Sequence, residues 1–408
     1  MNILSLQKLS SFFMILILVF PLLPVYFGAS QVHINLLVIF VASIVIFLSL
    51  VFGKGLGRAD PVVFMYYSLA QVLLIPSYWH DIQSGVEGFS GVVSFLRPTL
   101  LYVMYLTFNS TARGVLNGDS KLLIYFLVLS LLYSVVELFG LWDWAVYFFY
   151  KREEKIAIAR AVVTFFGTTY YAGYVYLVFF LLSYSTYLVK KKPTYLLLSA
   201  GALILTIAAQ SKIIWLSLIL SLFMLAYFNA KGSSGKVKFL VFVIAAFSFL
   251  FFGFEYLYKV LLSLELKSVR SLNTLLFNTE NSGTLLVRLE QILFSVNSLI
   301  DNNTIFGLGL ARELELESWV SLFLYRYGLL GFLSFIAFVF YLVFTSITNM
   351  KRLRGSRYYF YSVICLIWSL LLPLTQLSTA MIELSKLAVI SSFMIALTVN
   401  LKSLRESA

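Results

Sequence analysis

The sequence predicts an all-α polytopic membrane protein with about 12 transmembrane helices and a large helical periplasmic loop. Three observations predict it: an excess of apolar residues, apolar stretches of membrane-spanning length, and basic residues confined to alternate loops. Of the 408 residues, 61% are hydrophobic and 12% are charged, whereas a soluble domain is about half apolar and about a quarter charged. A water-soluble core of this size cannot hide so much apolar surface, so the surface must face lipid.

Twelve apolar stretches approach the roughly 20 residues that cross a hydrocarbon layer. They lie near 9–29, 32–52, 61–79, 89–108, 122–141, 169–189, 195–209, 213–229, 237–257, 319–348, 358–376 and 380–400. The pair 195–209 and 213–229 is short enough for a re-entrant hairpin, but two spans fit the loop charges better. The first stretch follows Lys8 as a signal peptide would. We interpret it as a transmembrane helix because it is long, has no A-x-A site and precedes further spans.

Basic residues indicate the orientation. With the N-terminus inside, the inside loops hold 17 Lys and Arg residues, while the short outside loops hold only Lys212. Cytoplasmic loops are enriched in Lys and Arg, so both termini are expected in the cytoplasm of a bacterial inner membrane. This bias also accounts for the net charge of +12, and no nucleic acid is needed as a partner.

The chain is expected to form a single integral membrane domain, 1–408, with long periplasmic loops at 142–168 and 258–318. In the second loop, apolar stripes at helical spacing predict two amphipathic helices, and in the later one Arg288, Gln291 and Ser295 form a polar face. Two interpretations stay open: helices that lie on the membrane or over a cavity, and ordinary packing helices with solvated polar faces.

Charged residues within the predicted spans are costly, at about 2.5–3.5 kcal/mol each at the bilayer centre. There are five, and all fall in the outer part of the membrane: Arg97, Glu137, Arg326, Glu383 and Lys386. Their shared depth predicts a polar cavity open to the periplasm. Glu383 and Lys386, three residues apart, are expected to pair with each other. Arg97 precedes Pro98, where a helix irregularity would hydrate it, and Arg326 fits either a snorkelling or a functional role.

The ligand expected in this cavity is a phosphate. Arginine in a partly dry site suits phosphate or carboxylate, and membrane access favours a lipid-linked phosphate. The chain has one cysteine and two histidines, far apart in sequence, so no Cys and His cluster for a metal exists. The sequence predicts neither a metal nor another cofactor.

Several short motifs lie in the outside loops and at the outer ends of the predicted spans. They read Arg288-Leu-Glu-Gln-Ile-Leu, Asn303-Thr-Ile-Phe-Gly307-Leu-Gly309, Glu317-Ser-Trp-Val-Ser, Tyr327-Gly328-Leu-Leu-Gly331, Gln210-Ser211-Lys212, and Arg160 with Gly167 and Gly173. Together they resemble the superfamily of O-antigen polymerases (Wzy-type) and O-antigen ligases. The resemblance covers the hydropathy of the whole chain and the motifs of about a quarter of it.

The resemblance implies a membrane glycosyltransferase that polymerises undecaprenyl-pyrophosphate-linked oligosaccharide repeat units at the periplasmic face, for O-antigen or a related surface polysaccharide. It implies no nucleotide sugar, metal or other cofactor. The partners would be the lipid-linked glycan, the lipid bilayer and a chain-length regulator.

The same resemblance assigns roles to residues. Catalytic roles fall to Arg288, which would stabilise the leaving pyrophosphate, and to Glu317, which would accept the proton of the attacking hydroxyl. Pyrophosphate or glycan binding falls to Arg160, Lys212, Arg326 and Arg97. Glu313 and Glu315 are alternatives to Glu317, and Glu317 also fits an acid at a helix N-terminus. Gly307 and Gly309 are expected to form a tight turn beside the site.

Two departures bear on the choice within the superfamily. Glu317 stands where the ligase branch has a histidine, and no histidine follows His80, so polymerase is favoured over ligase. Lys212 replaces the usual arginine, so no bidentate clamp is expected there. A flippase for the same lipid-linked glycan is the main alternative. Such transporters usually show two similar halves and short outside loops, whereas this sequence has no internal repeat and its long outside loop 258–318 has no counterpart in the first half.

Overall fold

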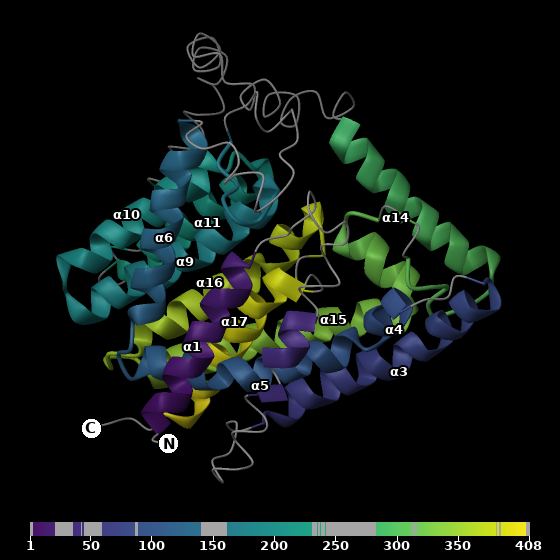
Figure 1. The fold of residues 1–408 in the computed structure, drawn as a ribbon, viewed down its shortest axis with the longest axis horizontal. Helices are drawn as coiled ribbons and strands as arrows, with labels where there is room; N and C mark the ends of the chain where they lie inside the picture. Colours follow the sequence, from purple (N-terminus) through teal and green to yellow (C-terminus); the bar gives the residue numbers. More distant parts are fainter. Residues whose placement is uncertain are drawn as a thin grey trace.

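The regular secondary structure of the computed structural model is helical, with no strand in the part that it describes (Figure 1). That part comprises residues 3–20, 36–41, 43–44, 59–85, 89–139, 161–230, 235, 237, 241, 283–311, 314, 316–380, 382 and 385–404. The sequence prediction of a helical membrane protein is confirmed. The predicted spans 237–257 and most of 32–52 lie outside the described residues, as does the first predicted loop helix.

Six described helices are long and apolar enough to span a membrane. They are α3 (Pro61–Gln83), α6 (Lys121–Leu138), α9 (Thr169–Lys190), α11 (Lys212–Asn229), α15 (Trp319–Arg352) and α17 (Ser385–Ser403). Three shorter apolar helices are α1 (Ile3–Val19), α10 (Pro193–Ala208) and α16 (Tyr359–Thr375). Their bounds follow the apolar stretches within a few residues at most ends, because apolar length decides where a helix can cross lipid.

The helices run in alternating directions between two ends of one bundle. We call the end at which α1 begins and α17 ends the proximal end, and the opposite end the distal end. The loops that carry the predicted site residues lie at the distal end. These are the segments before α9, between α10 and α11, and between α14 (Gly283–Asp301) and α15.

One predicted span differs in the structure. The stretch 89–108 is divided into α4 (Phe89–Phe95) and α5 (Arg97–Leu116), with Leu96 between them. Pro98 has no amide proton and so begins a new helix more readily than it continues one. Gln71 of α3 binds polar groups on both sides of the break. Its side-chain amide donates to the Phe95 carbonyl at 2.9 Å, and its side-chain oxygen accepts from the Thr99 hydroxyl at 2.9 Å.

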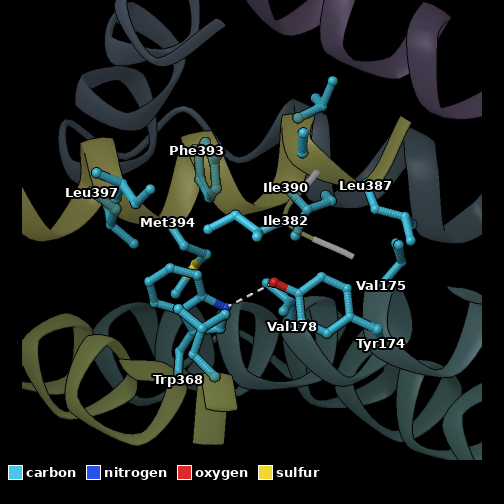
Figure 2. Close-up of a cluster of buried hydrophobic side chains, with 14 of the residues drawn as sticks. Tyr174, Val175, Val178, Trp368, Ile382, Leu387, Ile390, Phe393, Met394 and Leu397 are labelled. Atoms are coloured by element: carbon cyan, nitrogen blue, oxygen red, sulfur yellow. Dashed lines mark hydrogen bonds between the residues drawn. The ribbon is translucent and has the colours of Figure 1, made fainter. Parts of the chain in front are cut away.

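The centre of the bundle is formed by α9, α16 and α17, whose side chains are largely buried. Figure 2 shows Tyr174 of α9 between α16 and α17. Its hydroxyl accepts from the Trp368 indole at 3.1 Å and lies 3.0 Å from the Ser391 hydroxyl. A buried phenol needs such partners, so this contact fixes how the three helices pack.

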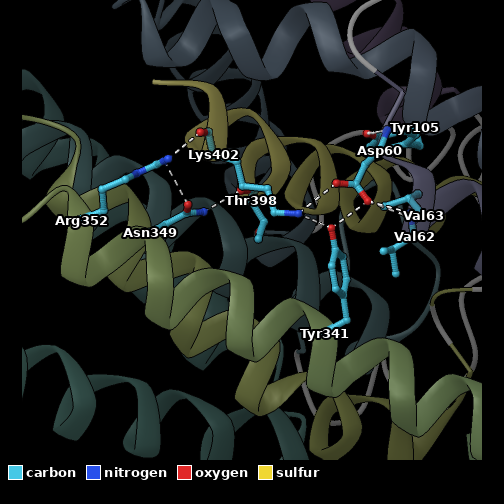
Figure 3. Close-up of polar contacts among 9 residues, drawn as sticks. All are labelled: Asp60, Val62, Val63, Tyr105, Tyr341, Asn349, Arg352, Thr398 and Lys402. Carbon is cyan, nitrogen blue, oxygen red and sulfur yellow. Dashed lines mark hydrogen bonds and ion pairs between the residues drawn. The ribbon is translucent and has the colours of Figure 1, made fainter. Parts of the chain in front are cut away.

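A polar cluster closes the proximal end (Figure 3). Asp60 caps α3 by accepting from the amides of Val62 and Val63, and its carboxylate also accepts from Lys402 at 3.1 Å and from Tyr341 at 2.7 Å. Aspartate is a preferred N-cap because its oxygen accepts from unpaired amides of the first turn. The starts of α3 and the ends of α15 and α17 are thereby tied together.

Candidate functional site

Helix α15 is bent at the distal end. Gly328 has φ 70° and ψ −173°, so the helix stops and restarts there. The loop 304–311 packs into the bend, and the Leu308 amide donates to the Tyr325 carbonyl at 2.8 Å. A Cβ on Gly328 would lie 2.3 Å from the Ile305 carbonyl oxygen, which no side chain tolerates. Only glycine satisfies both the positive φ and this contact.

Gly307 and Gly309 serve packing, and the expected tight turn at these two residues is wrong. Neither residue lies in a turn or has a positive φ, and the turn is at Asn302 and Asn303. A Cβ on Gly307 would lie 2.1 Å from the Arg326 carbonyl oxygen, and one on Gly309 would lie 2.7 Å from the Asp81 carboxylate. The motif therefore lets the loop backbone approach α3 and α15 closely.

Arg326 binds this loop. It is buried, and its guanidinium donates to the Leu310 carbonyl through Nε at 3.1 Å and Nη2 at 2.8 Å. Asp81 of α3 accepts from the Leu310 amide at 3.1 Å. A buried backbone group needs a partner, and here two side chains of opposite charge supply it. Arg326 thus has a structural role, because it binds the loop 304–311, which we call the motif loop. Sequence reasoning missed Asp81. Its only signal in the sequence was its position directly after an apolar stretch.

A second irregular segment, residues 161–166, is buried among α6, α9 and α10. The Glu137 carboxylate of α6 accepts from the amides of Val163 and Thr164 at 2.9–3.2 Å. The Lys386 ammonium of α17 donates to the Phe165 carbonyl at 2.5 Å and to the Phe20 carbonyl at 2.8 Å. Both charged side chains therefore bind backbone groups of this segment. Glu383, the expected partner of Lys386, lies outside the described residues.

The start of α9 lies against the start of α11. Gly167 turns the chain into α9 with φ 75°. On α9 itself, a Cβ on Gly173 would lie 3.1 Å from the side chain of Ile214 on α11. The absence of a side chain at Gly173 lets the two helices approach, so the first turn of α9 lies near Lys212, the first residue of α11.

Two predicted site residues pair at the distal end, and a third, Lys212, lies close enough to interact electrostatically with one of them. Arg288 Nη2 of α14 lies 3.3 Å from the Glu317 carboxylate, and the charge of Arg288 acts on the Lys212 ammonium. The Glu317 charge acts in turn on the hydroxyl of Tyr171 in the first turn of α9. Residues far apart in the chain, from α9, α11, α14 and the start of α15, therefore share one electrostatic neighbourhood.

The side chains of this cluster keep access to ligand. Glu317 is half exposed, Arg288 is partly exposed, and Arg288 Nε is buried with no hydrogen-bond partner in the described part of the chain. A guanidinium has five N–H donors, and the contact with Glu317 uses one nitrogen. The arrangement can therefore bind an anion through Arg288 and Lys212 while a carboxylate stays beside it.

The polar face predicted for α14 is the face that contacts α15. The Gln291 side-chain oxygen accepts from the Glu317 amide at 3.0 Å, and the Ser295 hydroxyl donates to the Ser321 carbonyl at 3.1 Å. Ser318 is the N-cap of α15, so Glu317 lies just outside the helix. This packing holds Arg288 and Glu317 next to each other.

The remaining predicted residues are distributed as follows. Arg97 is the first residue of α5, half-buried at the break after α4. Arg160, Glu313 and Glu315 lie outside the described residues. The described part thus places Lys212, Arg288 and Glu317 near one another, and it places Arg326 on α15, where it binds the adjoining loop.

Comparison with known proteins found no family model that matches the chain and no similar curated protein. Fold alone does not imply function, which depends on the chemistry of a site. The function is therefore argued from the distal cluster and its surroundings.

Proposed function

We propose that this chain is a membrane glycosyltransferase that polymerises undecaprenyl-pyrophosphate-linked oligosaccharide repeat units, as an O-antigen or related surface polysaccharide polymerase. The observation that carries the proposal is the convergence of Lys212, Arg288 and Glu317 at one end of the helix bundle. Two cations and one carboxylate are the groups that this transfer requires. They lie in a protein with six described helices long and apolar enough to span a membrane, so a lipid-linked substrate would have access from the side.

The cations suit the leaving group. When the glycan leaves undecaprenyl pyrophosphate, negative charge increases on the diphosphate, and preorganised cations stabilise that charge most in the transition state. Arg288 offers a planar fork of donors and Lys212 offers a compact charge. Arg160, which directly precedes the buried segment 161–166, would add a third cation, and Arg97 and Arg326 complete the set proposed from the motifs.

The carboxylate suits the acceptor. The hydroxyl oxygen of the new repeat unit attacks the anomeric carbon of the growing chain, and the bond from that carbon to the pyrophosphate oxygen breaks. Glu317 takes the hydroxyl proton, and the electron pair of the broken bond leaves with the pyrophosphate. Because Arg288 pairs with Glu317, an incoming diphosphate would draw Arg288 away and release the carboxylate as a base.

The proposed topology places this chemistry in the periplasm. Twelve spans with both termini in the cytoplasm of a bacterial inner membrane put the distal end outside. The proximal end holds the basic residues Arg113, Lys190, Lys191, Arg352 and Lys402, which is the bias expected of a cytoplasmic side. The substrate reaches the periplasmic face already attached to lipid, so the protein needs no nucleotide sugar.

The test is the length of the surface glycan in a strain that lacks the protein. Loss of a polymerase leaves single repeat units on the surface, loss of a flippase leaves almost none, and loss of a ligase leaves long chains unattached. Expression of Arg288→Ala in this strain should leave only single units, whereas wild type should restore the ladder of long chains. Glu290→Ala, an exposed acid on the same helix, is the matched control and should restore the ladder.

A full ladder from Arg288→Ala at wild-type protein level would remove Arg288 from the site. An absence of all surface glycan in the deletion strain would instead favour the flippase.

A further inference from the structure

Helix α14 has three kinds of surface around its circumference. One face packs on α15 through Arg288, Gln291 and Ser295, as described above. A helix with one face against protein has the rest of its surface left for solvent or lipid. The distribution of side chains over that remaining surface is not uniform.

An apolar stripe runs along the side of α14 that is turned away from the packed face. Leu286, Leu289, Leu293 and Ile300 follow one another at spacings of three, four and seven residues, so they line one side of the helix. All four are exposed, with Leu293 at 59% and Ile300 at 67%. Four large aliphatic side chains in a row on a helix surface are costly in water.

A polar stripe lies on the side away from α15. Glu290, Asn297 and Asp301 are spaced seven and four residues apart, and all three are exposed. At 3.6 residues per turn, this stripe is next to the apolar one, and both lie on the half of the helix turned away from the packed face. On the other flank of the polar stripe, Val287 and Phe294 are also exposed. The free half of α14 therefore presents a polar stripe between apolar side chains.

The apolar stripe continues onto the surface of the spanning helices. After α14 the exposed side chains of Ile305 and Phe306 follow, and their backbone packs on Gly328 at the bend of α15. Directly after that bend, Leu329 and Leu330 of α15 are exposed. Figure 1 shows α14 lying across the distal end of the bundle, oblique to α3. The exposed apolar surface thus passes from the spanning part of α15 to α14.

We propose that α14 is an interfacial helix that lies along the surface of the lipid bilayer at the distal end, with the stripe of Leu286, Leu289, Leu293 and Ile300 among the lipid chains and the polar stripe in water. An amphipathic helix parallel to the membrane buries its apolar face at the boundary of headgroups and acyl chains. This position places Arg288 at headgroup level. The inference concerns lipid contact only, so it stands whether or not the protein is a polymerase.

The test uses the full-length protein reconstituted in vesicles of phosphatidylethanolamine and phosphatidylglycerol. The native Cys365 is buried, so a thiol-reactive fluorophore should label Leu293→Cys and leave the wild type unlabelled. Asn297→Cys, four residues along the same helix, is the matched control on the polar stripe. Two quenchers are compared, a phospholipid with a nitroxide on its acyl chain and iodide in the water.

The lipid nitroxide should quench the fluorophore at Leu293→Cys several-fold more strongly than at Asn297→Cys, and iodide should do the reverse. Equal iodide quenching at both positions would overturn the proposal, because the stripe would then face water. Protection of Leu293→Cys from both quenchers would also overturn it, because protein, either another segment of this chain or a second copy, would then cover the stripe. Ile300→Cys serves as a second probe of the stripe if Leu293→Cys does not fold.

Discussion

Asp81 and Arg326 bind the two backbone polar groups of a single residue, Leu310. The carboxylate accepts from its amide at 3.1 Å, and the guanidinium donates twice to its carbonyl, at 2.8 and 3.1 Å. The motif loop is thereby fixed between α3 and α15 by charges of opposite sign. Glu137 and Lys386 do the same for the segment 161–166. In both places a charged side chain forms hydrogen bonds with amide or carbonyl groups of a non-helical segment, and these groups would otherwise have no partner.

Arg326→Met should destabilise the protein by about 1–3 kcal/mol, because the Leu310 carbonyl loses its donors in a buried place. Arg326→Lys should recover part of this loss, since an ammonium also donates. Unfolding of the purified protein in detergent measures the difference. Asp301→Asn, which changes an exposed charge on α14, should have little effect. A stability of Arg326→Met equal to that of wild type would show that the Leu310 contact contributes nothing.

Gly328→Ala should destabilise the protein more than Gly355→Ala. Both glycines have positive φ, at 70° and 90°, but Gly355 has nothing within 4 Å of an added Cβ, whereas Gly328 has the Ile305 carbonyl at 2.3 Å. The backbone strain alone costs of order 1–3 kcal/mol, and Gly355→Ala should show only that part. Melting temperatures of the two variants measure the extra cost of the contact. Equal values would mean that the loop moves aside freely.

Glu137→Gln and Lys386→Met should each lower stability, and the double variant should lose less than the sum of the two. Glu137 binds the amides of Val163 and Thr164, and Lys386 binds the next carbonyl, so both stabilise one segment. Once the segment is released by the first change, the second has less to remove, and neighbouring sites are non-additive by about 0.5–3 kcal/mol. A double-mutant cycle on unfolding free energies tests this. Strict additivity would argue that the two contacts act independently.

The stability of the proximal end should depend on pH through Asp60. Burial pushes the pKa of Asp60 up, but the hydrogen bond from Tyr341 and the charge and hydrogen bond of Lys402 outweigh it, so the pKa lies below its ordinary value of 3.8. A lowered carboxyl pKa contributes stability above the unfolded value and loses it as pH falls through the folded one. Wild type should therefore lose this advantage below about pH 4.

Asp60→Asn isolates this charge, because asparagine is also a good N-cap. The variant should be less stable than wild type at pH 7, and the difference should shrink as the pH falls below the ordinary carboxyl value. Unfolding measured for both proteins over the acidic range gives the difference. A gap that stays constant with pH would mean that the ionised form of Asp60 contributes no stability.

Glu317→Gln should lower the rate of chain extension strongly while the variant still binds lipid-linked substrate. A general base contributes about 10²–10⁴-fold to rate, and glutamine keeps the size of glutamate but cannot accept the proton. Extension of purified lipid-linked repeat units in vesicles measures the rate. Glu290→Gln on α14 is the control and should retain activity. A wild-type rate for Glu317→Gln would identify its pairing with Arg288 as structural.

Sequence patterns predicted the helices because helix position depends on local composition. Apolar stretches marked α3, α6, α9 and α11 within a few residues, since lipid selects length and hydropathy along one segment. The break at Leu96 was only partly visible, because Pro98 signals it but Gln71 of another helix completes it. The polar face of α14 was also readable, since its periodicity is local.

What the amino-acid sequence determined by itself is a helical membrane protein and the set of residues from which a distal site could be built. Which of them meet was decided only by tertiary packing. Lys212, Arg288 and Glu317 come from separate elements. Arg326 and Lys386 bind backbone carbonyls that could not be predicted from the spacing of residues in the sequence. The physical reason is that hydropathy acts within one segment, whereas a charge in a low-dielectric interior is stabilised by whichever group the fold brings beside it.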